Sequence, residues 1–227
     1  MSLGVMSVNP EFFGQGVGRR LVREIIRSAE ASGHPAIRLV GSAINMDSFS
    51  LYNRAGFIPK QCYQDMVVPV PICGLGRSVP SREQVRAAGE ADVAAMRVLE
   101  LAVSGIVREP DYRYAIANPR GAFSAAVLEG RQGGIDGFVF SVNHPALRMI
   151  GPLVARTEDA AIALLAHALE GFRGGAALAV VPMDRRKVLD TLYHWGARNV
   201  ETHLFQVRGE FQPFAGVSFP SFLPETG

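Results

Sequence analysis

Apolar residues first recur at a helical spacing shortly after the start of the chain. Val17, Leu21 and Ile25 are four positions apart, and arginine and glutamate side chains fill the positions between them. This pattern predicts an amphipathic helix that begins near Val17 and runs to about Ala31, with Gly33 ending it.

Shorter patterns on either side predict strands and a second helix. Gly4–Val8 alternates weakly and predicts a strand, and Ile37–Val40 predicts a buried strand. Asn45–Ala55 predicts a helix that a glycine ends, and Phe57–Val70 carries strand-like stretches interrupted by a proline.

A similar alternation of strands and helices begins again in the second half of the chain. The predicted strands are Ala122–Leu128, Gly137–Val142, Met149–Ala155, Ala176–Val181 and Glu201–Val207. The predicted helices are Glu90–Ser104, Thr157–Phe172 (with Thr157 as its N-cap) and Arg185–His194. The glycines of residues 130–134 predict a hairpin between the first two strands.

Proline and glycine gather between these two halves, in a composition typical of a linker. We therefore expect a first unit at residues 1–68, a linker at 69–84, a second unit at 85–211 and an irregular tail at 212–227.

Two landmarks indicate that the units are tandem copies. Pro10 and Pro152 are 142 residues apart, and each stands between a predicted strand and a predicted helix. A Leu-Tyr pair precedes a glycine in each half of the chain, and the tyrosines of the two pairs, Tyr52 and Tyr193, are 141 residues apart. We expect one strand–helix–strand–helix–strand unit to occur twice, with Tyr193 matching Tyr52. Chance recurrence of common residues is the alternative. The first copy lacks the strands that precede this landmark in the second.

Composition narrows the class of protein. Hydrophobic residues make up 48% and charged residues 19%, which is typical of a globular protein. A formal net charge of +2 gives no argument for nucleic acid or a membrane surface as a partner. Two cysteines do not form a disulfide framework or a zinc site, and no signal-peptide or bilayer-spanning pattern occurs. We expect a cytoplasmic protein.

Three alternating glycines stand between the first predicted strand and helix. Without β-carbons at Gly14, Gly16 and Gly18, the backbone can approach a ligand closely, and its N–H groups at a helix N-terminus suit a diphosphate. No Gly-Lys-Ser/Thr follows, and the third glycine is misplaced for a dinucleotide fingerprint. Taken alone, these glycines also fit a tight turn that binds nothing.

A second block of residues makes the pattern more specific. Two blocks resemble, in order and spacing, motifs of the GNAT acetyltransferases: Val8-x-Pro10 with Gly14-x-Gly16-x-Gly18-Arg19-x-Leu21, and Asn45-x-x-Ser48-x-x-Leu51-Tyr52-x-x-x-Gly56-Phe57. The resemblance covers about residues 4–65 and implies an α/β fold with a mixed, splayed sheet flanked by helices, in two units in tandem. Phe13 departs from the arginine or glutamine usual in the family.

The resemblance also implies roles. The backbone of Val8 would pair with the pantetheine arm of acetyl-CoA, and Asn45 would contact that arm or brace the splayed strands. Tyr52 would be the general acid for the leaving thiolate, since a phenol with a pKa of about 10 is protonated at neutral pH. The residues implied in cofactor binding are Val8, Phe13, Gly14, Gln15, Gly16, Val17, Gly18, Arg19, Asn45 and Ser48. A helix N-cap at Asn45 and a packed aromatic at Tyr52 are the alternatives.

The implied activity is acetyl transfer from acetyl-CoA to a small primary amine by direct attack, with no base identified. One alternative is a non-catalytic module that binds acyl-CoA. Another is a structural protein whose first unit is completed by a second chain in a homodimer, because the edge at Gly4–Val8 would be unpaired.

The second unit carries a weaker motif. Ile150–Ala155 leads into the predicted helix without a Gly-x-Gly, and Glu158 and Asp159 in the first turn of that helix repel phosphate. We therefore expect poor or no binding of coenzyme A by the second unit. Arg108–Tyr114 either lines an acceptor pocket or forms a solvated loop. The five histidines show no metal-binding spacing, so no metal site is predicted.

Overall fold

The computed structural model describes residues 1–76, 79–130 and 133–220. Its strands are β1 (Ala36–Ser42), β2 (Ile58–Val70), β3 (Val85–Ala87), β4 (Phe123–Glu129), β5 (Ile135–His144), β6 (Leu147–Ala155), β7 (Gly175–Pro182), β8 (Arg198–Gly209) and β9 (Val217–Phe219). Its α-helices are α1 (Val17–Ala31), α2 (Met46–Arg54), α3 (Val93–Ser104), α4 (Glu109–Ala117), α5 (Glu158–Leu169) and α6 (Arg186–His194). Short 3-10 helices occupy Pro10–Phe12, Arg82–Gln84, Glu90–Asp92 and Glu170–Phe172.

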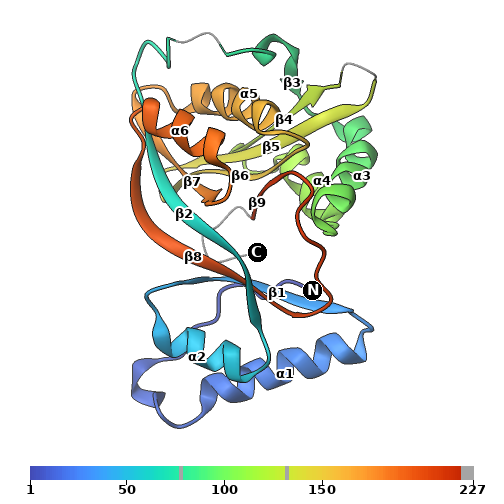
Figure 1. Ribbon diagram of the computed structural model, residues 1–227, viewed down its shortest axis with the longest axis vertical. Helices are drawn as coiled ribbons and strands as arrows, with labels where there is room; N and C mark the ends of the chain where they lie inside the picture. Colours follow the sequence, from blue (N-terminus) through green and yellow to red (C-terminus); the bar gives the residue numbers. More distant parts are fainter. Residues whose placement is uncertain (77–78, 131–132, 221–227) are drawn as a thin grey trace.

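The described strands form one mixed sheet with helices packed against it. Their order is β1-β8-β2-β7-β6-β5-β4-β3, and β9 pairs with β6 outside this path. Figure 1 shows α1 and α2 at one end of the molecule and α3 to α6 at the other, with the long strands β2 and β8 running between the two ends. This is the α/β fold with a splayed sheet that the sequence predicted.

The two units repeat the same run of elements. The helices α2 and α6 begin at residues 46 and 186, and the strands β2 and β8 begin at residues 58 and 198, so both pairs are 140 positions apart. Gly56 and Gly196 stand at the same point of each copy and share positive φ angles of 87° and 88°. At this separation Tyr193 matches Asn53, so the expected match of Tyr193 to Tyr52 was wrong by one position.

Each unit receives a long strand from the other. β8 pairs through His203–Gly209 with the whole of β1 and also pairs with β2, so it lies between the two strands of the first unit. In turn, β2 pairs with both β7 and β8, so it lies between two strands of the second unit. The units are therefore repeats in sequence but share one sheet. β2 also extends to Val70, inside the segment 69–84 that was expected to be a linker.

The two faces of β1 pack against different cores. Ile37 and Leu39 belong to the core that α1 and α2 cover, together with Tyr52 and Phe57. Val40 belongs to a second core on the opposite face, which holds Tyr63, Phe205, Val142 and Met149 from both units. Alternation along the strand explains this division, because successive side chains point to opposite faces.

Three local predictions were wrong. Gly4–Val8 forms no strand; only Met1–Leu3 runs beside β1, through hydrogen bonds of 2.8 and 3.0 Å with Arg38, and Val5 beyond it is 63% exposed. Arg108–Tyr114 is not a loop, since α4 occupies most of it and buries Tyr112 completely. The tail expected to be irregular contains β9, because Val217 and Phe219 are apolar and buried in the sheet.

A buried ion pair lies where the units meet. Glu100 on α3 is fully buried and pairs with Arg108, which also donates to the carbonyl oxygen of Pro220. Arg38 on β1 donates to the carbonyl oxygen of Gly105 at 3.3 Å, beside the same pair. Burial raises the pKa of Glu100, and the charge of Arg108 acts in the opposite direction.

None of the helices in the described ranges combines the length and the apolar character needed to cross a bilayer.

Candidate functional site

The glycine loop ends in an open helix N-terminus. Gly14 and Gly16 adopt φ angles of 76° and 78°, in the left-handed region that favours glycine, and a β-carbon on either would meet no atom within 4 Å. Gly16 is the N-cap of α1 and provides no side chain to cap it. Gly18 has a different role, because a β-carbon there would lie 3.2 Å from Leu51 of α2, so glycine lets the two helices pack closely.

The backbone of this loop presents free donors. The N–H groups of Gly14, Gly16, Val17, Gly18 and Arg19 have no hydrogen-bond acceptor in the described part of the chain, whereas those of Gln15 and Arg20 do. The first N–H groups of an α-helix point outward along its axis, toward the positive end of its dipole. Together they make a site that favours an anion.

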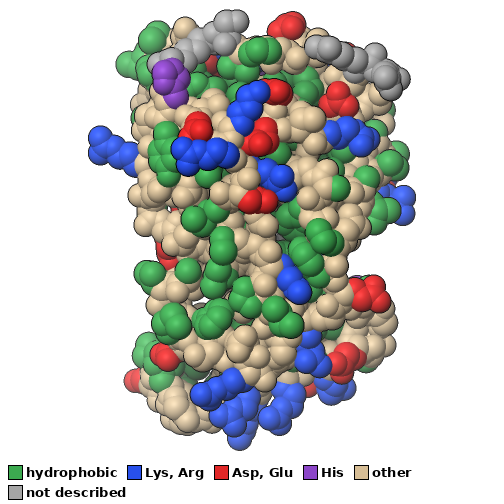
Figure 2. Space-filling view, viewed as in Figure 1, with side chains coloured by type: hydrophobic (Ala, Val, Ile, Leu, Met, Phe, Trp, Pro, Cys, Tyr) green, Lys and Arg blue, Asp and Glu red, His purple; other side chains and the backbone are tan. Residues whose placement is uncertain are grey.

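Exposed arginine side chains follow this loop on α1. Arg19, Arg20 and Arg23 follow the glycines on α1, and all are exposed. Figure 2 shows Lys and Arg side chains gathered at the end of the molecule where α1 lies. The ion pairs of α1 among the described residues use Glu24 with Arg27 and Glu30 with Arg208, which leaves the first three arginines without an acidic partner there.

A splayed edge of the sheet leads away from the loop. Ser2 bridges Arg38 in parallel with β1, and the chain then leaves the strand. No backbone hydrogen bond joins residues 4–8 to any described residue. Val8 ends this diverging segment near Gly18. The free edge of β1 and the backbone before Val8 therefore expose amide groups on both sides of a wedge.

The second predicted block lies on α2, beside the same edge. Asn45 is the N-cap of this helix, and its side-chain oxygen accepts from the N–H of Ser48 at 3.0 Å, as a helix cap does. Tyr52 is 8% exposed and packs edge-on against Phe57, with ring centroids 5.9 Å apart. Phe13, which departs from the motif, is 66% exposed.

The corresponding helix N-terminus of the second unit is already capped. The hydroxyl of Thr157 accepts from the N–H of Ala160 at 3.2 Å, which confirms the predicted N-cap. The carboxylate of Glu158 accepts from the N–H of Val188 on α6 at 3.0 Å. The side chain of Thr157 thus occupies the N-cap position that is open at Gly16 in the first unit, whereas Glu158 caps the start of α6, as Asn45 caps α2.

The splayed edge of the second unit is filled as well. β6 pairs in parallel with β7 only at Met149 and Ile150, so these two strands also diverge. Farther along, Leu153–Ala155 pairs with the tail strand β9. A β-carbon on Gly216, just before β9, would overlap the carbonyl oxygen of Ala155, so glycine allows the tail to enter this wedge. The tail satisfies the backbone groups that stay free in the first unit.

Comparisons with known protein families agree with this geometry. A model described as "Acetyltransferase (GNAT) domain" matches residues 99–213, which is more than half of the chain, and one described as "Acetyltransferase (GNAT) family" matches residues 1–57. The chain belongs to the GNAT acetyltransferase family. The two matches fall on the two units, so this GNAT protein carries the family pattern twice.

Solved structures show the same fold. A Pyrococcus horikoshii protein named as an acetyltransferase has a TM-score of 0.76 at 17% identity, over 100% of this chain and 72% of that chain. A GCN5-related N-acetyltransferase from Kribbella flavida has a TM-score of 0.58 at 20% identity, over 92% of this chain and 52% of that chain. The GNAT chain thus spans about half of the Kribbella protein. No curated protein matches it.

Sequence reasoning missed one polar cluster of this GNAT chain. Asp65 on β2 lies with Glu201 and His203 on β8, and one possible metal-ligand atom from each lies within 4.8 Å of the others. Asp65 is 4% exposed and His203 is 1% exposed. Histidine spacing along the chain could not reveal this group, because the strand exchange alone brings β2 beside β8.

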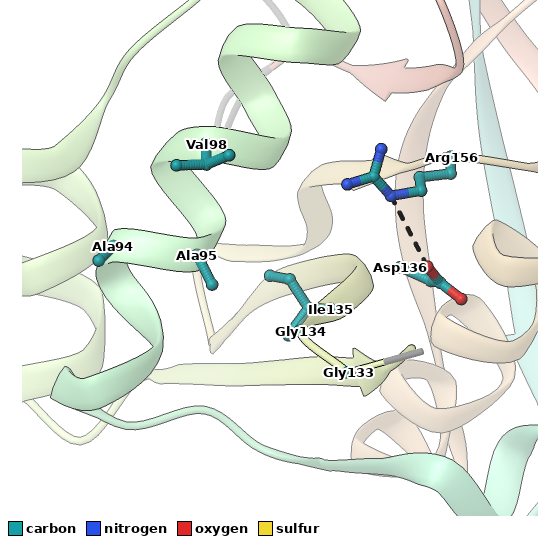
Figure 3. Close-up of a pocket in the computed structure, with 8 residues that line it drawn as sticks. All are labelled: Ala94, Ala95, Val98, Gly133, Gly134, Ile135, Asp136 and Arg156. Atoms are coloured by element: carbon teal, nitrogen blue, oxygen red, sulfur yellow. Dashed lines mark ion pairs between the residues drawn. The ribbon is translucent and has the colours of Figure 1, made fainter. Parts of the chain in front are cut away.

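A separate cavity of about 710 Å³ opens between α3 and the start of β5. Figure 3 shows its lining, which includes Ala94, Val98 and Gly134, and marks an ion pair between Arg156 and Asp136 with a dashed line. The paired atoms are 3.6 Å apart. The two charged side chains of this lining, Asp136 and Arg156, pair with each other, and the other lining residues are small or apolar, so the cavity presents no helix N-terminus or unpaired charge for a cofactor. We therefore place the candidate site at the glycine loop of the first unit.

Proposed function

We propose that the first unit binds acetyl-CoA and transfers its acetyl group to a small primary amine. The observation that carries this proposal is the set of five unpaired N–H groups at the N-terminus of α1. They suit the pyrophosphate of coenzyme A, with Arg19, Arg20 and Arg23 close by in the sequence to add positive charge. The amides of the pantetheine arm match the free backbone groups in the wedge between Val8 and β1.

In this proposal the amine attacks the thioester directly. The amine nitrogen forms a bond to the carbonyl carbon, and the carbon–sulfur bond then breaks. Tyr52 donates its hydroxyl proton to the departing thiolate. Its position supports this role, because a β-carbon on Gly41 of β1 would lie 4.0 Å from the Tyr52 ring, which places the phenol at the edge of the wedge.

Replacing Tyr52 with phenylalanine is expected to lower kcat by about 100-fold, the usual contribution of a general acid, while acetyl-CoA binding changes little. The measurement is the rate of thiol release from acetyl-CoA in the presence of a small primary amine, beside a calorimetric titration. Tyr193→Phe is the matched control, because Tyr193 is 43% exposed and lies on α6 of the second unit. An unchanged kcat in Tyr52→Phe would exclude this residue as the acid. Binding without transfer to any amine would indicate an acyl-CoA-binding module instead.

A further inference from the structure

The cluster of Asp65, Glu201 and His203 lies on one face of the two exchanged strands. Asp65 is the register partner of Glu201, and His203 is the partner of Tyr63 on β2 and of Ser42 on β1. Glu201 and His203 are two residues apart on one strand, so they share a face. This face is the one opposite α1, α2 and Tyr52.

The carboxylates of this cluster have no lysine or arginine partner in the part of the chain that the structure describes. Asp65 Oδ1 lies 3.0 Å from His203 Nδ1 and accepts no hydrogen bond, although the residue is 4% exposed. Glu201 accepts from the hydroxyl of Ser42 and is only partly buried. Within the described ranges, neither carboxylate forms an ion pair with a lysine or an arginine. Such a group attracts a cation, and a protonated amine is one.

The cluster also lies beside the end of β1 that passes Tyr52. Ser42, which contacts Glu201, directly follows Gly41, which faces Tyr52 on the other side of β1. An amine held by Glu201 would therefore reach the end of β1 from the face opposite the general acid. A base and an acid on opposite sides of the reacting carbon suit direct transfer, because one takes a proton while the other gives one.

We propose that Glu201 is the catalytic base of the first unit and that it receives the acceptor as an ammonium ion; this rests on the proposed acetyl transfer. Glu201 takes one proton from the ammonium nitrogen and releases it to solvent. The neutral nitrogen bonds to the acetyl carbon, the carbon–sulfur bond breaks, and Tyr52 protonates the thiolate. The second nitrogen proton leaves as the amide forms and restores Tyr52 through solvent. His203 and Asp65 are positioning residues behind Glu201.

This assignment gives the second unit a part in catalysis. Glu201 and His203 belong to β8, whereas Tyr52 and the glycine loop belong to the first unit. The strand exchange places β8 beside β1 and so completes a site that the first unit does not contain by itself. The second unit would then contribute the base, although its own cofactor wedge is filled by β9.

The test compares two small nucleophiles on wild type and Glu201→Gln, with acetyl-CoA binding measured in parallel. Ethylamine is an ammonium ion near neutral pH and needs a base, whereas hydroxylamine is already uncharged. We expect Glu201→Gln to slow transfer to ethylamine by about 100-fold and to change transfer to hydroxylamine by less than about threefold. Glu210→Gln, at an exposed glutamate just after β8, is the matched control and should change neither rate.

Each other outcome overturns a defined part of the account. Full ethylamine activity in Glu201→Gln excludes Glu201 as the base. If Glu201→Gln loses transfer to both nucleophiles equally, Glu201 has a structural role and the proposal is overturned. A wild type that binds acetyl-CoA but transfers the acetyl group to neither nucleophile also overturns the proposal. A wild type that does not bind acetyl-CoA overturns the proposed function itself. Binding and transfer are read separately, so the two failures are distinguishable.

Discussion

Replacing Gly16 with glutamate should weaken acetyl-CoA binding by at least about 100-fold. The side chain would place a carboxylate at the N-terminus of α1, where the unpaired N–H groups are proposed to hold the pyrophosphate. It would also require a non-glycine residue to adopt a φ of 78°, which costs on the order of 1 kcal/mol. Calorimetric titration with acetyl-CoA measures the effect.

The variant Gly33→Glu tests whether weaker binding in Gly16→Glu comes from the charge added at the site or from backbone strain. Gly33 follows the other end of the same helix, has a φ of 69°, and has no atom within 4 Å of a built β-carbon. The control therefore adds the same charge and a similar strain, but far from the proposed site. Its affinity for acetyl-CoA should match that of the wild type. If both variants lose binding equally, the loop assignment is wrong and the effect is one of stability.

The second large effect concerns stability. Arg108→Met is expected to lower the free energy of unfolding by about 3–5 kcal/mol at pH 8, because it leaves the buried carboxylate of Glu100 without its partner. The loss should be smaller at pH 5. Burial already raises the pKa of Glu100, so in the variant the folded state holds a proton that the unfolded state releases, and stability falls as the pH rises through this range.

Urea unfolding of the wild type and three variants at both pH values measures this effect. Arg113→Met, on the helix α4 that follows Arg108, is the control, since its pairs with Glu109 and Glu90 are partly exposed and each should contribute only about 0–1 kcal/mol. In the double variant Glu100→Leu/Arg108→Met, the buried charge is absent and much of the lost stability should return. A loss in Arg108→Met that does not depend on pH would show that packing, and not the uncompensated charge, accounts for it.

The local elements of the first unit could be predicted because their signals lie close together in the sequence. Apolar spacing predicted α1 from Val17 to Ala31, and the capping asparagine and the following glycine framed α2. The glycine loop could be predicted for the same reason, since alternate glycines before a helix start form a local pattern. A resemblance over about 60 residues then connected that loop to α2.

The pairing of distant strands could not be predicted in this way. β2 and β8 are separated by more than 100 residues, and nothing in the alternation of either strand reveals its partner. The cluster at Asp65 and His203 depends on that pairing, and so does the filling of the second wedge by Val217–Phe219. The prediction of a strand at Gly4–Val8 was wrong for a related reason, because a segment with weak alternation forms no strand without a neighbouring strand to pair with.

Titration of the wild-type chain with acetyl-CoA tests the central claim most directly. The first wedge and its helix N-terminus are open, whereas the second wedge is filled by β9 and the corresponding helix N-terminus is capped by Thr157. The account therefore predicts one binding site per chain, with a dissociation constant of about 1 μM to 1 mM, the range usual for enzyme substrates. Two equivalent sites would show that β9 does not block the second wedge, and no binding would contradict the assignment of the glycine loop.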